Sequence, residues 1–323
     1  GLTEVNSEKD ATALFGADAT ITNFEALTIS DGSQVAKVDF TGLAYDTVNV
    51  MAASASMAVT FSDGNDTLGL AGSMGTLTIT GADASIDFIG KMDVTAAVSA
   101  TATTKLDLDL AADAAVSIKS LDVKDGATIT VTDTGVEKDG SLKIEGVTVT
   151  TKGVTIDGSA VATATLDITG SDKADTIKGG AGDDHLAGGK GADMLYGGAG
   201  ANTFKVATEG VDSVAKVIAA ADSIMDWAAG AGNKIDGAAD VAGEKAYGEF
   251  SVNDKGVVTF GNSSLTLDQM VNMLNDGLAT AGSVLFTHGS DSYVFSNDDA
   301  TISDILVKIA GVTNITDLHD ILA

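Results

Sequence analysis

Between residues 20 and 170, apolar and polar positions alternate in short runs. Each run sets Leu, Ile or Val beside Thr, Asp, Asn or Ser, which is the period-2 pattern of a strand with one buried face. Gly, Asp, Ser and Ala separate the runs roughly every ten residues. The pattern therefore predicts many short strands. Clear examples are Ala26–Ile29, Thr47–Val50, Thr76–Ile79, Thr128–Val131 and Thr165–Ile168.

Two architectures accommodate so many short strands. An antiparallel sandwich needs tight hairpins, but Asp-Gly turn signals are few here and the chain has no Pro. A solenoid, in which each strand pairs with the coils above and below, fits the loose repetition better. Low aromatic content (5%) and 38 Gly also suit flat, stacked strands. We predict an all-β fold, with a parallel β-solenoid over residues 1–169 and the sandwich as the alternative.

Residues 170–205 carry a strict nine-residue repeat of the form G-G-x-G-x-D-x-U-x, where U is a large apolar residue. The second and third repeats match at every position. The first has Ser171 and Lys173 in place of Gly, and the fourth has Asn202 in place of Asp. Four copies in one register argue against a Gly-rich linker with scattered acids. The repeats begin at Gly170, Gly179, Gly188 and Gly197.

Each repeat combines a turn that can bind an ion with a short strand that fills a core. The glycines allow backbone conformations closed to other residues and remove Cβ atoms that would block an ion. Carbonyls at positions two, four and six can face one side together with the carboxylate at position six. Such a set of hard oxygen ligands, half of them uncharged, is typical of a Ca²⁺ site. The inward apolar residues are Ile177, Leu186, Leu195 and Phe204.

These repeats resemble the repeat-in-toxin (RTX) family, whose nonapeptides form a parallel β-roll with Ca²⁺ between turns. In that family two repeats make one coil, so the resemblance implies that Asp175 pairs with Asp193. Asp184 would likewise pair with Asn202. The outer repeats, which depart from the pattern, should bind calcium more weakly or cap the roll. The implied ligand positions are Ser171, Lys173, Asp175, Gly180, Gly182, Asp184, Gly189, Gly191, Asp193, Gly198, Gly200 and Asn202.

Residues 206–323 are predicted to form a small α+β module. An amphipathic helix is expected at Leu267–Asn275, capped by Ser264 or Thr266. Strand-like runs follow, and the chain ends on a short amphipathic tail. The two runs and the tail are Val284–Phe286, Tyr293–Phe295 and Ile315–Ala323.

The same module resembles the segment that closes the roll in RTX proteins. That resemblance makes Asp222, Asp226 and Asp236 further candidate calcium ligands, although a solvated acidic loop explains them equally well. The last four residues, Asp320–Ala323, resemble the C-terminal signal read by type I secretion machines. We therefore predict a roll-capping and secretion-signal module, with the type I apparatus as a partner.

Charge and composition exclude several classes of partner. The chain has 18 Lys, no Arg and 46 acidic residues, which gives a net charge of -28. Nucleic acid and anionic lipid are bound through positive charge, so neither is expected as a partner. No Cys is present, which excludes disulfides and thiolate metal sites. Because no apolar run approaches about 18 residues, direct membrane insertion is not expected.

Enzyme motifs are missing from the sequence. It contains neither H-E-x-x-H nor G-x-S-x-G, and the three His are widely separated. An acidic turn at Asp63–Leu68 reads as an ordinary turn more readily than as an isolated calcium turn. We therefore expect no active site within this chain. It begins at Gly1, so a secreted hydrolase would need its catalytic domain further upstream.

Upstream strand runs resemble the β-solenoid portion of Gram-negative surface-layer proteins that share this secretion route. We expect a secreted structural subunit of a bacterial surface layer, which folds and self-assembles on binding extracellular Ca²⁺. The alternative is an RTX adhesin or biofilm-matrix protein that binds cells or carbohydrate. The runs that carry the resemblance are Ile21–Ile29, Val38–Leu43 and Thr47–Val50.

Overall fold

The computed structural model divides the chain into two compact units, unit 1 (Gly1–Thr169) and unit 2 (Gly170–Ala323). Parts of the upstream runs, at 21–25 and 41–43, lie outside the described residues. The structure describes residues 4–5, 26–29, 37–40, 47–53, 56–61, 66–111, 114–133, 140–206, 213–228, 230–237, 245–246, 249–278, 282–297 and 304–323.

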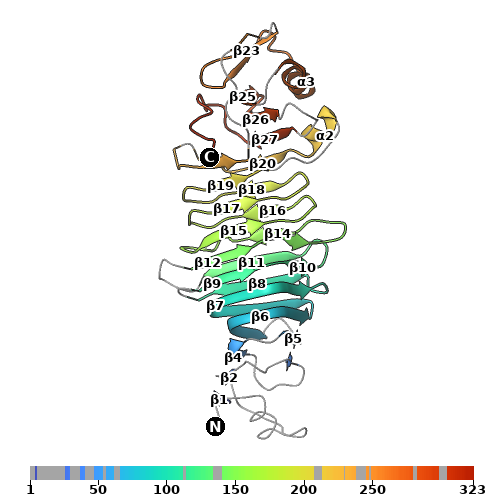
Figure 1. The fold of residues 1–323 in the computed structure, drawn as a ribbon, viewed down its shortest axis with the longest axis vertical. Coiled ribbons are helices and arrows are strands. Elements are labelled where there is room, and N and C mark those ends of the chain that lie inside the picture. The colour runs from blue at the N-terminus through green and yellow to red at the C-terminus, as the bar shows by residue number, and fades with distance from the viewer. Residues whose placement is uncertain are drawn as a thin grey trace. The chain divides into compact units, whose positions relative to one another are not determined.

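Unit 1 consists of strands that pair in parallel from coil to coil (Figure 1). They are β1 (Glu4–Val5), β2 (Ala26–Ile29), β3 (Lys37–Asp39), β4 (Thr47–Ala53), β5 (Met57–Thr60), β6 (Thr67–Thr80), β7 (Asp83–Ala100), β8 (Lys105–Leu110), β9 (Ala115–Ile118), β10 (Leu121–Val123), β11 (Thr128–Asp133), β12 (Ser141–Ile144), β13 (Val147–Thr148), β14 (Thr155–Asp157) and β15 (Thr165–Thr169).

The register shows the coils directly. Leu106 in β8 pairs with Ile129 in β11, which pairs with Ile156 in β14, so corresponding positions recur after 23 and 27 residues. The strand pairs in the described part of unit 1 are parallel, whereas a sandwich built from hairpins requires antiparallel neighbours. The predicted parallel β-solenoid is confirmed, and the sandwich alternative is wrong.

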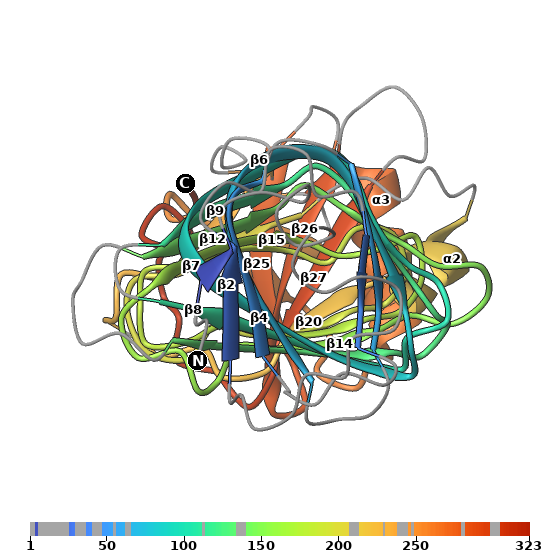
Figure 2. The ribbon, with the colours of Figure 1, turned by 90° about the horizontal axis from the view of Figure 1, so that it is seen from below.

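The interior of unit 1 is filled by rows of aliphatic side chains. Strand residues alternate between buried and partly exposed, as the period-2 sequence pattern predicts. Ile118, Ile144 and Ile168 stand in register on three successive coils, and each is fully buried. Figure 2 views the strands from the end of the stack, so that successive coils overlie one another. The apolar side chains of each coil pack only against the coils directly above and below it, and these contacts stabilise a solenoid.

Unit 2 begins with the nonapeptide coils, in which corresponding positions recur after 18 residues. Their strands are β16 (Thr176–Lys178), β17 (His185–Ala187), β18 (Met194–Tyr196), β19 (Thr203–Lys205), β20 (Asp222–Ile224) and β21 (Lys234–Asp236). β16 pairs with β18, and β18 with β20; β17 pairs with β19, and β19 with β21. The parallel strand pairing of the repeats therefore continues into β20 and β21, which follow the last repeat. The predicted domain boundary at residue 206 remains a prediction.

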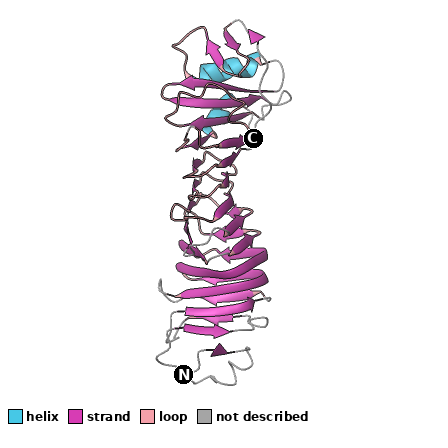
Figure 3. Ribbon diagram, turned by 90° about the vertical axis from the view of Figure 1, so that its left-hand side faces the viewer, coloured by secondary structure: helices cyan, strands magenta, loops and turns pink. Residues whose placement is uncertain are grey.

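The remaining part of unit 2 holds its described helices, α2 (Val214–Ala219) and α3 (Leu267–Gly277) (Figure 3). α3 confirms the expected helix. Thr266 caps it and forms a reciprocal capping box with Gln269. The other strands are β22 (Lys245–Ala246), β23 (Phe250–Val252), β24 (Val258–Phe260), β25 (Gly282–His288), β26 (Asp291–Asn297) and β27 (Ile305–Ile309).

C-terminal residues cover the last coil of the roll. β27 pairs with β20, and Leu322 bridges to Ile235 in β21. The tail is not helical, but it buries Leu318 and Ile321, in keeping with its predicted amphipathic character. Both strands of the last coil therefore have a partner beyond the roll, so neither is left as an unpaired edge. Among the described residues, no helix combines the length and apolar character needed to cross a membrane.

Candidate calcium-binding site

The turns of the roll stack so closely that glycine is required at several positions. Gly189 and Gly198 have φ values of +106° and +76°, which side chains rarely adopt. A Cβ on either residue would approach a carbonyl oxygen of the preceding coil to less than 3.0 Å. The glycines of one coil therefore lie directly against backbone carbonyl oxygens of the preceding coil, and both belong to the implied ligand positions. The glycine and carbonyl pairs are Gly189 with Ser171, Gly198 with Gly180, and Gly200 with Gly182.

On one side of the roll, the position-six aspartates of the first and third repeats and an aspartate of the following coil form a ladder, here called the aspartate ladder (Asp175, Asp193 and Asp222). The Asp193 Oδ1 atom accepts the backbone N–H of Asp175 at 2.7 Å, 18 residues earlier. Asp222 Oδ1 accepts the backbone N–H of Asp193 at 3.0 Å. All three side chains are buried. The structure therefore brings together the implied pair and adds Asp222 in the next coil.

On the other side stands the amide ladder (Asp184, Asn202 and Asn233). Asn202 Oδ1 accepts the backbone N–H of Asp184 at 2.9 Å. Asn233 Oδ1 accepts the backbone N–H of Asn202, also at 2.9 Å. The sequence reasoning missed Asn233. The sequence feature that could have identified Asn233 is the apolar residue two positions later, Ile235. The same spacing separates Asp222 from Ile224, and the sixth residue of each repeat from the eighth.

The second oxygen of each carboxylate turns back toward its own repeat. Asp175 Oδ2 accepts the backbone N–H of Ser171 at 2.6 Å, and the Ser171 hydroxyl also donates to this carboxylate. Asp184 Oδ2 accepts the backbone N–H of Gly180 at 2.8 Å. The departure from Gly at Ser171 is thus explained, because its hydroxyl adds a hydrogen bond. Asp193 differs, since its buried Oδ2 has no hydrogen-bond partner in the described part of the chain.

Asp193 carries an electrostatic penalty that a cation would relieve. Burial, and then the negative charge of Asp222, raise its pKa to about 8, although the hydrogen bond from Asp175 opposes the shift. An opposite charge nearby would favour the carboxylate form. A buried oxygen without a partner and repulsion between neighbouring acids both fit a bound cation.

Backbone carbonyls in the turns are candidate ligands beside the carboxylates. Among the described residues, no three His or acidic side chains converge on one point. Stacked carbonyls beside single carboxylates suit Ca²⁺, which accepts six to eight oxygens in flexible geometry, better than octahedral Mg²⁺. Gly180, Gly182, Gly189, Gly191, Gly198 and Gly200 lie in these turns.

The structure places the remaining candidates differently. Asp226 is exposed, and its carboxylate accepts the backbone N–H groups of Gly197 and Gly198, each at 2.8 Å. It thus caps the first two backbone amides of the fourth repeat. Asp236 is exposed at the end of β21, and Lys173 lies in the first turn. Their roles as ligands remain predictions.

Calcium affinity should rise with pH because a proton competes for Asp193. In the ion-free protein this pKa is raised from 3.8 to about 8. The contribution of the protonated group to folding stability is therefore present below about pH 4 and is lost as the pH rises through about 8. Calcium titrations between about pH 6 and pH 9 should show affinity increasing and then levelling off. Asp193→Asn should flatten this dependence, whereas equal pH dependence in both proteins would contradict it.

Comparison with known families identifies the repeats. Residues 169–204 match the RTX calcium-binding nonapeptide repeat in four copies. No curated protein sequence matches the chain significantly. The match contains the first two members of each ladder and stops before Asp222 and Asn233. Repeats of this kind bind calcium, and the roll provides the stacked oxygens that the ion needs. Residues 169–204 are therefore RTX-type calcium-binding nonapeptide repeats, within a chain that contains a parallel β-solenoid.

Proposed function

We propose that this chain is a secreted, non-enzymatic structural subunit of a bacterial surface layer, which folds and assembles on meeting extracellular calcium. The observation that carries the proposal is the combination of a calcium-binding roll with a parallel β-solenoid of strongly acidic composition. Calcium would promote both folding and assembly, because it supplies positive charge to the turns and neutralises acidic groups on the surface. RTX-type repeats support the extracellular, calcium-binding part of this role.

Folding would wait for export because calcium is scarce inside the cell. Without the ion, a net charge of -28 repels itself and the roll turns lack their counter-charge. Extracellular calcium modules have dissociation constants of about 10⁻⁴–10⁻³ M, so millimolar calcium fills them. At ten times the dissociation constant, each site adds about 1.4 kcal/mol to stability. Metal binding is thus coupled to folding.

Acid rows on unit 1 supply a reason for calcium-dependent assembly. Asp87 in β7 and Asp109 in β8 are paired in register, and Asp107 lies two residues before Asp109. Burial and the charge of Asp109 raise the pKa of Asp87. Like charges at neighbouring strand positions repel one another. Divalent ions that bridge such rows to a second molecule would remove this repulsion and join the molecules.

We expect the purified chain to associate into sheets or fibres as calcium rises to millimolar concentration. Light scattering and electron microscopy across a calcium titration measure this. Sodium chloride at equal ionic strength should be much less effective, because it screens charge without bridging carboxylates. A protein that folds on calcium yet stays monodisperse at high concentration would contradict the surface-layer role.

A second candidate is an adhesin that binds carbohydrate. An open groove of about 590 Å³ lies in unit 1. Hydroxyl, carboxylate and ammonium groups line it, and these are the groups that hydrogen-bond sugars. Glycan binding that is lost in Asp122→Ala, by a protein that does not assemble, would favour this candidate. The lining residues are Thr101, Asp122, Val123, Lys124, Asp125, Thr148, Val149 and Thr150.

Export is proposed to depend on the C-terminal tail. A chain that lacks residues 315–323 should stay inside cells that carry a type I exporter. The tail also packs in the folded protein, since Ile235 donates its N–H to Ile321 O at 2.7 Å. Deletion should therefore also destabilise unit 2. Normal secretion of the shortened chain would refute the signal assignment.

A further inference from the structure

The groove on unit 1 lies at a corner of the solenoid, where successive coils turn after β7, β10 and β13. The coils differ in length there. From Leu121 to Thr128 the chain advances seven residues, whereas the paired stretch of the next coil, from Val147 to Thr155, advances eight. The extra residue makes the later turn longer than the turn against which it stacks. This difference leaves a step between the two turns, and the groove of about 590 Å³ lies there.

One wall of the groove is fixed by a carboxylate that bonds across this step. Asp125 Oδ1 accepts the backbone N–H groups of Thr150 and Thr151 at 2.6 and 3.0 Å, and Oδ2 accepts the Thr151 hydroxyl. The bond from this hydroxyl, followed by the bonds from the two amides, lowers the pKa of Asp125 to about 2. Asp125 therefore stays ionised at neutral pH and holds the wall in place, so the groove is formed before any ligand binds.

Two other charged groups of the groove remain available to a ligand. Asp122 lies in β10 and Lys124 follows two residues later, and both line the groove. Lys105 and Asp107 in β8 have the same spacing and close into an ion pair at 2.6 Å. Within the described part of the chain, neither Asp122 nor Lys124 forms an ion pair, and Asp122 accepts one long hydrogen bond, from the Ser120 hydroxyl at 3.4 Å. The groove thus offers one strong acceptor and one strong donor.

Hydroxyl groups flank this acceptor on the neighbouring coils. Asp122 pairs in register with Ser99 in β7 and with Thr148 in β13. Hydrogen-bonding side chains therefore follow one another along the solenoid axis, about 4.8 Å apart. The described lining contains no aromatic ring. Its remaining members are two hydroxyl and two aliphatic side chains, namely Thr101, Thr150, Val123 and Val149.

This set of groups selects a ligand rich in uncharged hydroxyl groups. The net charge of -28 repels anionic ligands such as nucleic acid and acidic polysaccharide. A sugar hydroxyl can donate to a carboxylate and accept from an ammonium group. We propose that the groove binds a neutral glycan, with Asp122 accepting from its hydroxyls and Lys124 donating to them. The inference rests on the carbohydrate-binding candidate above, and it names the ligand class and the residues that recognise it.

Glycan recognition in this groove does not use calcium. Asp125 is already bonded to amides, and the Lys124 ammonium lies where it would repel a second cation. Among the described residues, no three acidic or His side chains converge on a point that could hold a metal ion. The chain thus separates its two binding tasks, with the sugar bound by unit 1 and calcium by the roll of unit 2.

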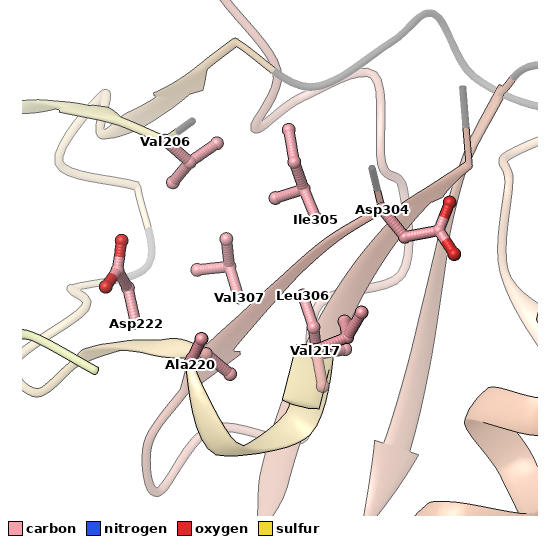
Figure 4. Close-up of a pocket in the computed structure, with 9 residues that line it drawn as sticks. Val206, Val217, Ala220, Asp222, Asp304, Ile305, Leu306 and Val307 are labelled. Carbon is pink, nitrogen blue, oxygen red and sulfur yellow. The ribbon is translucent and has the colours of Figure 1, made fainter. Parts of the chain in front are cut away.

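The enclosed cavity of unit 2 is too small for such a ligand. Its volume is about 10 Å³, which is room for about one water molecule. Figure 4 shows the carboxylates of Asp222 and Asp304 at its opposite ends, with Val307 and Leu306 between them. A water molecule fits there, whereas a sugar ring does not.

Titration calorimetry of the full chain in saturating calcium tests the groove, with neutral hexasaccharides of glucose and of mannose as probes. At least one should bind, with a dissociation constant of about 1 mM because the groove is open and polar. Asp122→Asn and Lys124→Met should each weaken this binding about tenfold, because each removes a charge-assisted hydrogen bond. Absence of binding to every neutral probe overturns the proposal, and so does tighter binding of an acidic hexagalacturonate.

Matched controls remove the same charges elsewhere on unit 1. Asp167→Asn and Lys143→Met break an ion pair between β15 and β12, outside the groove, and should leave glycan affinity unchanged. An equal loss in the controls overturns the assignment of Asp122 and Lys124. Coupling between two sites is reciprocal, so saturating glycan should leave calcium affinity unchanged, and a shift overturns calcium independence. A chain that assembles but binds no glycan overturns this site while leaving the surface-layer role intact.

Discussion

Excess chelator should unfold the nonapeptide coils of unit 2 and red-shift the fluorescence of the chain's single tryptophan. Trp227 is 8% exposed and its ring lies 6.0 Å from that of Phe204 in β19, so it reports on the last coil. Without calcium, Asp193 must be protonated or unpaired, and the stacked turns lose their cation. Circular dichroism should show a parallel loss of β signal.

Millimolar calcium should restore both signals. Magnesium should restore much less, because it demands small octahedral sites. Asp66→Ala is a matched control for Asp193→Ala, since both remove a buried aspartate but Asp66 lies outside the repeats, before β6. The control should leave the calcium response unchanged. Tryptophan emission and melting temperature that do not change in excess chelator would contradict calcium-coupled folding.

Replacing Gly198 by Ala should destabilise unit 2 strongly. The residue has φ +76°, and a Cβ would press against the carbonyl oxygen of Gly180 in the preceding coil. The backbone conformation alone costs an alanine about 1–2 kcal/mol. Overpacking against a backbone that cannot retreat adds about 1–3 kcal/mol. Urea unfolding in saturating calcium measures the sum.

Gly230 separates these two costs. Its φ is +82°, nearly that of Gly198, but a Cβ there has nothing within 4 Å. Gly230→Ala should therefore show only the conformational cost, and its calcium affinity should be unchanged. Gly198→Ala should also bind calcium more weakly, because Gly180 belongs to the stacked turn. Equal destabilisation in the two variants would show that the close stacking of turns contributes little.

The sequence alone determined the repeats and the type of strand. Period-2 runs predicted strands with one buried face, and rows such as Ile118, Ile144 and Ile168 fulfil that pattern. The nine-residue register predicted a calcium roll. Both signals are local, because a strand face and a turn are specified by residues close together in the chain.

Only the tertiary structure decided how the ladders end. Asp222 and Asn233 join the ladders 29 and 31 residues after Asp193 and Asn202, with α2 between the fourth repeat and β20, so the nine-residue register does not place them there. Asp226 resembled a ligand in sequence, but its carboxylate caps the amides of Gly197 and Gly198. Whether an acid faces an ion, an amide or solvent depends on which coil stacks against it. That stacking is set by the packing of the whole unit, which a local pattern does not encode.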